Sequence, residues 1–183
     1  ALTVFAGDSD LTTVWTGAGD GSDWHDNANW SNYAPAPAGL AFITNSATVA
    51  LKEDSAALAS IVVSNNATIT FSNWNTTLSA DSMKIGNKGT ITSAGPIRNG
   101  EMSNNVVIVC ETFELANNGK IDLAGKGYAG ATRSESIGHG PGGSGSTGNN
   151  GGGGGHGGKG GEGGFFTNLG SYTSASPGGP TYG

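Results

Sequence analysis

The sequence of 183 residues has a single cysteine, Cys110, and only 12% of its residues are charged. One cysteine permits no internal disulfide bond, and it excludes zinc sites built from paired cysteines. Lysine and arginine number 8 against 14 aspartates and glutamates, which gives a formal net charge of −6. Binding to nucleic-acid phosphates needs clustered basic side chains, so we expect no nucleic-acid partner.

Other hallmarks of membrane proteins and enzymes are also missing. No run of about 18 apolar residues is present, so we expect no membrane insertion. The glycine-rich run GGGHGGKG lacks the Ser or Thr of a phosphate-binding loop. An extended strand would place Glu111 and Glu114 on opposite faces, which does not make a pair of catalytic carboxylates. We therefore expect a protein that is not an enzyme and has no cofactor.

What the chain does contain is a recurring seven-residue phrase: apolar, any, Asn, any, small, any, apolar. It reads ITNSATV, VSNNATI, IGNKGTI and LANNGKI, and more loosely FTNLGSY in a fifth copy. A short, regular repeat of this kind is typical of a solenoid, in which a coil buries its inward side chains only by stacking on the next. We therefore expect an all-β fold, a parallel β-helix. The asparagines of the four clear copies are Asn45, Asn65, Asn87 and Asn117.

Stacking the coils in register would place the apolar residues of the phrase in two interior columns. The first comprises Ile43, Val63, Ile85 and Leu115, and the second comprises Val49, Ile69, Ile91 and Ile121. Each asparagine would then occupy the same corner, where its amide can bond to neighbouring coils and its backbone tolerates a left-handed turn. We predict that the four asparagines form a ladder.

Three of the four tryptophans, Trp15, Trp24 and Trp30, lie within 16 residues among Gly, Asp and Asn. Large rings between turn-forming residues favour a compact loop packed over the end of a sheet, which we interpret as an N-terminal cap. An exposed platform on which glycans stack is the alternative.

The same loop carries Asp20, Asp23 and Asp26. Carboxylate oxygens are ligands that Ca²⁺ prefers, so these three residues are a weak calcium candidate. Aspartates that stabilise turns are the plainer interpretation.

The stretch WTGAGDGSDWHDNANWSNYAPAP, followed by AFITNSATVAL and SIVVSNNATITF, resembles the start of autotransporter-like bacterial exported surface proteins of the β-strand-repeat type. The matching positions are Trp15, Gly17, Trp24, Asn29, Trp30 and Pro35 or Pro37. The resemblance implies a right-handed parallel β-helix used as a passenger, adhesin or surface scaffold. Together with a first residue, Ala1, that suits a mature product after signal-peptide removal, it leads us to expect an extracellular or cell-surface location.

We divide the chain into four parts. Residues 1–40 form the first strands and the Trp-rich cap, 41–124 the coils, 125–164 a Gly-rich excursion, and 165–183 a further coil and tail. Glycine lets backbones approach closely and adopt positive φ, so we expect the Gly-rich excursion to be ordered against the solenoid.

Our leading functional hypothesis is a structural protein: an adhesin, scaffold, or subunit of a filament or surface layer. It would self-associate through the solenoid ends or the Gly-rich block. The alternative is a carbohydrate-binding or carbohydrate-cleaving fragment of a larger β-helix protein, with Trp74 as a further sugar platform. A third hypothesis is an ice-binding face, based on the alignment of Thr48, Thr68 and Thr90.

Overall fold

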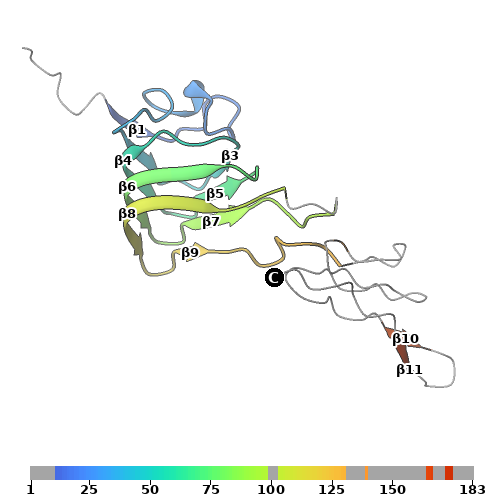
Figure 1. The fold of residues 1–183 in the computed structure, drawn as a ribbon. Helices are drawn as coiled ribbons and strands as arrows, with labels where there is room; N and C mark the ends of the chain where they lie inside the picture. The colour runs from blue at the N-terminus through green and yellow to red at the C-terminus, as the bar shows by residue number, and fades with distance from the viewer. Residues whose placement is uncertain (1–10, 99–102, 131–138, 140–163, 167–171, 175–183) are drawn as a thin grey trace, which may run out of the picture. The chain divides into compact units, whose positions relative to one another are not determined.

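The computed structural model describes residues 11–98, 103–130 and 139, and the backbone of residues 164–166 and 172–174. The chain divides into two compact units, residues 1–94 with 104–122 and residues 95–103 with 123–183. In the described residues the regular structure is almost entirely β-strand, in agreement with the predicted all-β class (Figure 1).

The first unit contains two sheets in which every strand pair is parallel. One sheet has the order β1-β2-β4-β6-β8 and the other the order β3-β5-β7-β9 (Figure 1). The strands are β1 (Thr12–Val14), β2 (Leu40–Ile43), β3 (Thr48–Leu51), β4 (Leu58–Val63), β5 (Thr68–Phe71), β6 (Thr77–Ile85), β7 (Thr90–Ser93), β8 (Val107–Leu115) and β9 (Lys120–Ile121). A short 3₁₀ helix, η2 (Asn27–Asn29), lies in the long loop between β1 and β2.

From β2 onward the chain alternates between the two sheets, so each strand pairs with the strand two positions later. The crossings from β2 to β3, β4 to β5, β6 to β7 and β8 to β9 are four-residue turns. The pairing aligns Ile43, Val63, Ile85 and Leu115 in one sheet. It aligns Val49, Ile69, Ile91 and Ile121 in the other. The alignment of both predicted columns is confirmed, and their members are buried except for Leu115 and Ile121, which are exposed.

Alternation of side chains along the strands produces the core. In β5 and β7 every second residue is buried, and Thr68, Thr70, Thr90 and Thr92 occupy the outward positions. β-Branched residues suit both positions because they pack well on a pleated surface. The inward residues Ile69, Phe71 and Ile91 are fully buried.

In the second unit, β10 (Gly164–Phe166) and β11 (Tyr172–Ser174) form an antiparallel pair. Phe166 and Tyr172, the two ends of the fifth phrase, pair with each other. They therefore do not add parallel strands to the two large sheets, which differs from the further coil expected here. Asn168 lies outside the described residues, as do residues 131–138 and 140–163 of the expected Gly-rich excursion. Among the described residues, no helix has the length and apolarity to cross a membrane.

Candidate functional site

The four predicted ladder asparagines occupy the second position of the four crossing turns, and all four are exposed. Asn87 Nδ2 donates to Asn65 Oδ1 at 3.1 Å, which is one step of a side-chain ladder. The two earlier asparagines bond to backbone carbonyl groups instead. Asn65 Nδ2 donates to Thr44 O at 3.0 Å, and Asn45 Nδ2 donates to Trp15 O at 3.3 Å. The structure aligns Asn117 with the others through the register of β9.

Left-handed backbone in these turns falls mainly on the residue after the ladder asparagine. Positive φ occurs at Asn66, Lys88 and Asn118, whereas among the ladder asparagines it occurs at Asn65. The left-handed backbone predicted at the corner is therefore wrong for Asn45, Asn87 and Asn117. The predicted amide bond to the neighbouring turn is present at Asn87.

The loop with the three tryptophans, residues 15–30, is called the Trp segment below. Trp30 packs edge-on against both other rings, with ring centroids 5.1 Å from those of Trp15 and Trp24. Trp30 Nε1 donates to Trp24 O at 2.8 Å, which satisfies the buried indole N–H. All three rings are buried in the main core. The glycan-platform alternative for these tryptophans disagrees with this burial, because stacking needs an exposed ring face.

The Trp segment bonds to the first strand edge of the smaller sheet. Trp24 N donates to Ala50 O at 3.1 Å, and Ala50 N donates to Ser22 O at 2.7 Å. Those bonds use backbone groups of β3 that β5 does not reach. An unpaired strand edge invites pairing with another chain, so the Trp segment closes this edge.

Asn29 holds the Trp segment together, and our sequence reasoning did not identify this role. Its side chain is fully buried, and Oδ1 accepts from Gly19 N at 3.0 Å and Gly21 N at 2.9 Å. Its Nδ2 donates to Asp20 Oδ1 at 2.7 Å and to Asp23 O at 2.9 Å. The only signal in the sequence was its position in the resemblance motif.

The three aspartates of the calcium candidate are engaged with the loop itself. Asp20 accepts from Ser22 N and Asp23 N, each at 2.8 Å, and Asp26 accepts from Asp20 N at 3.1 Å and Ala28 N at 3.0 Å. These bonds, with that from Asn29, hold the pKa of Asp20 far below its usual value. Across residues 11–98 and 103–130, no group of three or more His, Cys, Asp or Glu side chains is arranged to hold a metal. The structure therefore supports the turn-stabilising interpretation of these residues.

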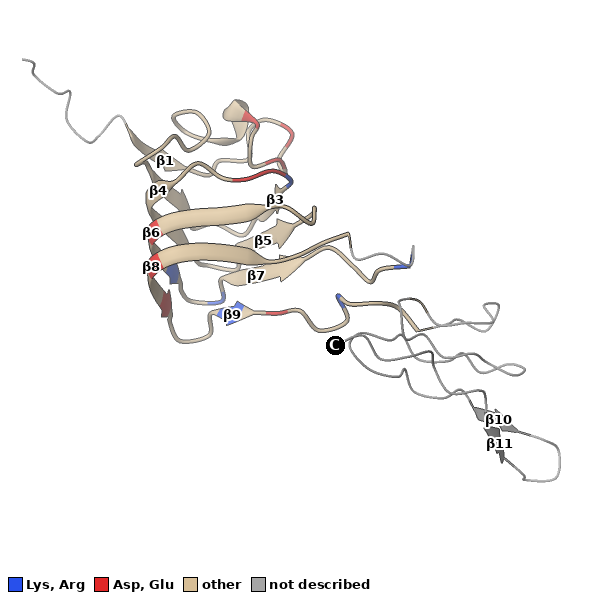
Figure 2. Ribbon diagram, viewed as in Figure 1, with Lys and Arg blue, Asp and Glu red and all other residues tan. Residues whose placement is uncertain are grey.

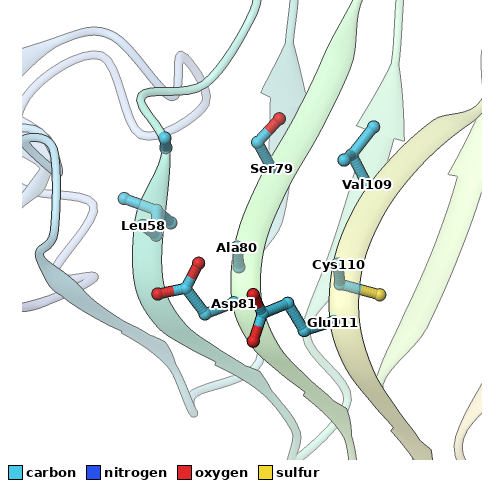
Figure 3. Close-up of a pocket in the computed structure, with 8 residues that line it drawn as sticks. Leu58, Ser79, Ala80, Asp81, Val109, Cys110 and Glu111 are labelled. Carbon is cyan, nitrogen blue, oxygen red and sulfur yellow. The ribbon is translucent and has the colours of Figure 1, made fainter.

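A shallow hollow of about 310 Å³ lies on the larger sheet, where β4, β6 and β8 run side by side (Figure 3). Asp81 and Glu111 come from the adjacent strands β6 and β8, and both are exposed. Figure 3 shows their carboxylates on the same side of the ribbon, while Cys110 Sγ points away from them. Two like charges on neighbouring strands repel each other, and none of the described residues that line this hollow is cationic.

A second hollow, of about 390 Å³, lies beside the ends of β3 and β5. Two loops form it, residues 52–54 after β3 and residues 73–76 after β5. We call it the Trp74 hollow, because Trp74 is the one tryptophan of the four with an exposed side chain. Charged positions are sparse over the two sheets and more frequent in the loops that border them (Figure 2).

The predicted alignment of threonines is present in the smaller sheet. Thr48 pairs with Thr68, and Thr68 pairs with Thr90. The next position is Lys120, which forms an ion pair with Asp122 at 2.8 Å. A charged pair therefore ends this row of aligned threonines after three strands.

Comparisons with known proteins identify no relative of this chain. No family model, no curated protein and no solved structure matches it. The resemblance to autotransporter-like surface proteins therefore stays a prediction, based on Trp15, Trp24, Trp30 and the repeated asparagine phrase.

Proposed function

We propose that this protein is a non-enzymatic, exported structural protein, a cell-surface scaffold that associates through one end of a right-handed parallel β-helix. The alternation of the chain between two parallel sheets and the in-register columns support the β-helix. The resemblance motif supports its handedness and its extracellular location. In this proposal the Trp segment is the N-terminal cap.

The observation that carries the proposal is the end of the interior columns at β8 and β9. The residues that complete the core in the preceding strands are Met83, Ile85 and Ile91, with exposed fractions of 1%, 0% and 0%. Their partners in the final strands are Phe113, Leu115 and Ile121, with exposed fractions of 40%, 51% and 43%. In the part of the chain that the structure describes, β8 and β9 have no partner strand on their outer edges. We call these three side chains and the two outer edges the open end.

A second copy of the same chain is the occupant we propose for the open end. Burying apolar side chains contributes about 25 cal/mol for each Å² removed from water, and pairing a free strand edge satisfies its backbone groups. Loop residues already bond the two opposite edges: Ala50 of β3 bonds to the Trp segment, and Val14 O of β1 accepts from Ser31 N at 2.8 Å. These edges therefore offer fewer free backbone groups than the open end. Two open ends facing each other across a twofold axis make a closed pair, which we favour over a filament.

The test is the oligomeric state of the intact chain and of one charge variant. We expect sedimentation to show dimers of the wild-type chain over a roughly hundredfold range of concentration. Leu115→Glu places a charge in the apolar contact and is expected to give monomers with an unchanged circular dichroism spectrum. Tyr33→Glu is the matched control, since Tyr33 is exposed elsewhere in the same unit and should leave the dimer intact.

Two results would overturn this proposal. One is a wild-type chain that stays monomeric throughout that range, which would mean that the open end is covered within the chain or binds something else. The other is a dimer that tolerates Leu115→Glu, which would place the contact on a different surface.

A further inference from the structure

The Trp74 hollow combines an exposed aromatic ring with polar side chains, a combination that favours ligand binding. The exposed fraction of Trp74 is 47%, whereas those of Trp15, Trp24 and Trp30 are 2%, 1% and 4%. The hollow's volume of about 390 Å³ lies within the range of ordinary small-ligand sites, about 300 to 1,000 Å³. An exposed indole beside such a hollow offers a flat apolar face to a ligand.

Amide and carboxylate groups surround the ring. Asn73 and Asn75 flank Trp74 in the chain, and Glu53 and Asp54 come from the facing loop. Together they present hydrogen-bond acceptors and amide donors. A sugar ring has an apolar face of C–H groups and a rim of hydroxyls, and these are the two chemistries that the hollow supplies.

Thr76 forms part of the wall of the hollow. Its side chain is almost fully buried, and its Oγ1 has no hydrogen-bond partner among the described residues. Because this oxygen is itself shielded from solvent, it lies behind the wall and is not counted among the groups that a ligand contacts.

The walls of the hollow are held in place before any ligand binds. Thr77 N donates to Asp54 Oδ1 at 2.7 Å, and Ser72 N donates to Leu51 O at 3.0 Å. Asn73 Nδ2 also donates to the carbonyl oxygen of Lys52, across the two loops. A site fixed in this way loses little conformational entropy on binding.

Charge selects among the ligands that this surface would accept. Glu53 and Asp54 carry negative charge. Lys52, the one cation among the described residues that line the hollow, is 2.9 Å from the carboxylate of Asp23 outside it. Sugars with carboxylate or sulfate groups would face repulsion here. Neutral sugars would experience no such repulsion.

We infer that the Trp74 hollow is a binding site for a neutral oligosaccharide, with one sugar ring stacked on Trp74 and its hydroxyls bonded to Glu53, Asp54 and Asn75. This inference does not depend on the proposed scaffold function, because the hollow and the open end share no residue.

Tryptophan fluorescence of the full chain tests the inference, since iodide reaches one exposed indole and leaves three buried ones unquenched. The probes are cellohexaose, xylohexaose, mannohexaose and chitohexaose, with hexagalacturonate as the anionic comparison. We expect at least one neutral probe to protect Trp74 from iodide, with a Kd between about 10 μM and 1 mM. Hexagalacturonate should give no protection.

Variants distinguish binding at this site from unspecific binding. Their affinities are measured by calorimetry, because variants without Trp74 lose the fluorescence signal used above. Trp74→Ala should weaken binding at least tenfold, and Trp74→Phe should retain part of the affinity. Tyr33→Ala, which removes an exposed aromatic outside the hollow, should bind as wild type. Failure of all four neutral probes at about 1 mM, or equal affinity of Trp74→Ala and wild type, would overturn the inference. Tighter binding of hexagalacturonate would refute the charge argument on which the choice of a neutral sugar rests.

Discussion

Asn29 and Asp20 are joined by a hydrogen bond of 2.7 Å between Nδ2 and Oδ1, and the two residues organise the loop that covers β3. Asn29 lies in η2 and is fully buried, whereas Asp20 is exposed. One side chain thereby fixes the loop from inside while the other binds its backbone amides from outside. The three tryptophans depend on this arrangement for their positions, since they lie in the same loop.

Replacing Asn29 with Ala should destabilise the protein strongly. The change removes four hydrogen bonds and leaves the N–H groups of Gly19 and Gly21 without their acceptor. At about 1 to 3 kcal/mol for each buried polar group left unpaired, we expect a loss of about 3 to 5 kcal/mol in the free energy of unfolding. Urea denaturation measures it. Asn75→Ala, at an exposed asparagine, is the control and should change stability by less than about 0.5 kcal/mol.

The low pKa of Asp20 predicts a loss of stability in acid. Backbone N–H groups of Asp23 and Ser22, and then the amide of Asn29, hold the folded-state pKa below the ordinary value of 3.8. Below that pH the carboxylate of Asp20 becomes protonated in the unfolded chain and stays ionised in the folded chain. Its contribution to the free energy of unfolding is therefore fully present above that pH and decreases as the pH falls. Asp20→Asn should therefore lose less stability than wild type between pH 7 and pH 3. An NMR titration that places the pKa of Asp20 at or above 3.8 would contradict this prediction.

Gly89 should not tolerate a side chain. A Cβ at this position would overlap with Val63 O, a backbone atom at the end of β4. Gly89→Ala should therefore cost at least about 3 kcal/mol, measured as a lower midpoint in urea. Gly127→Ala is the matched control, because a Cβ there has no atom within 4 Å among its described surroundings.

Substitution by valine should have opposite effects on stability at Thr76 and at Thr13. Both are buried, but Thr13 Oγ1 donates to Tyr33 O at 2.9 Å and Thr76 Oγ1 has no described partner. Thr76→Val should raise the free energy of unfolding by about 1 kcal/mol, and Thr13→Val should lower it by about 1 to 3 kcal/mol. Thermal unfolding of the two variants side by side gives the comparison. A destabilised Thr76→Val would mean that its hydroxyl is satisfied in solution.

The stacking register could be predicted from the sequence because one rule repeats in four places. Each phrase sets an apolar residue before and after a four-residue turn, and this spacing alone aligns Ile43 with Val63 and Val49 with Ile69. The position of the ladder asparagines followed from the same spacing. Their backbone conformation did not, because the choice between Asn65 and Asn66 as the left-handed residue depends on the whole turn.

Features that occur once in the chain were harder to predict. Asn29 is one asparagine among many polar loop residues, and its burial depends on how residues 19–23 fold around its side chain. The proximity of Asp81 and Glu111 requires the pairing of β6 with β8, whose separation in the chain is longer than the earlier repeats. The hairpin of Phe166 and Tyr172 shows that a phrase can recur in sequence and still form a different local structure.

The closed edge at β3 and the open end at β8 and β9 give the described strands a direction of folding. The residues up to β3 already include the loop that protects the first edge, so this loop is synthesised before the strands that follow β3. Every later strand then finds a finished edge to join, as Ser60 joins Leu40 and Ser82 joins Ser60. Each addition closes a short loop, so the order of synthesis is also an efficient order of assembly. A chain of this kind can lengthen during evolution by gaining coils after the last one, with no change to those before it.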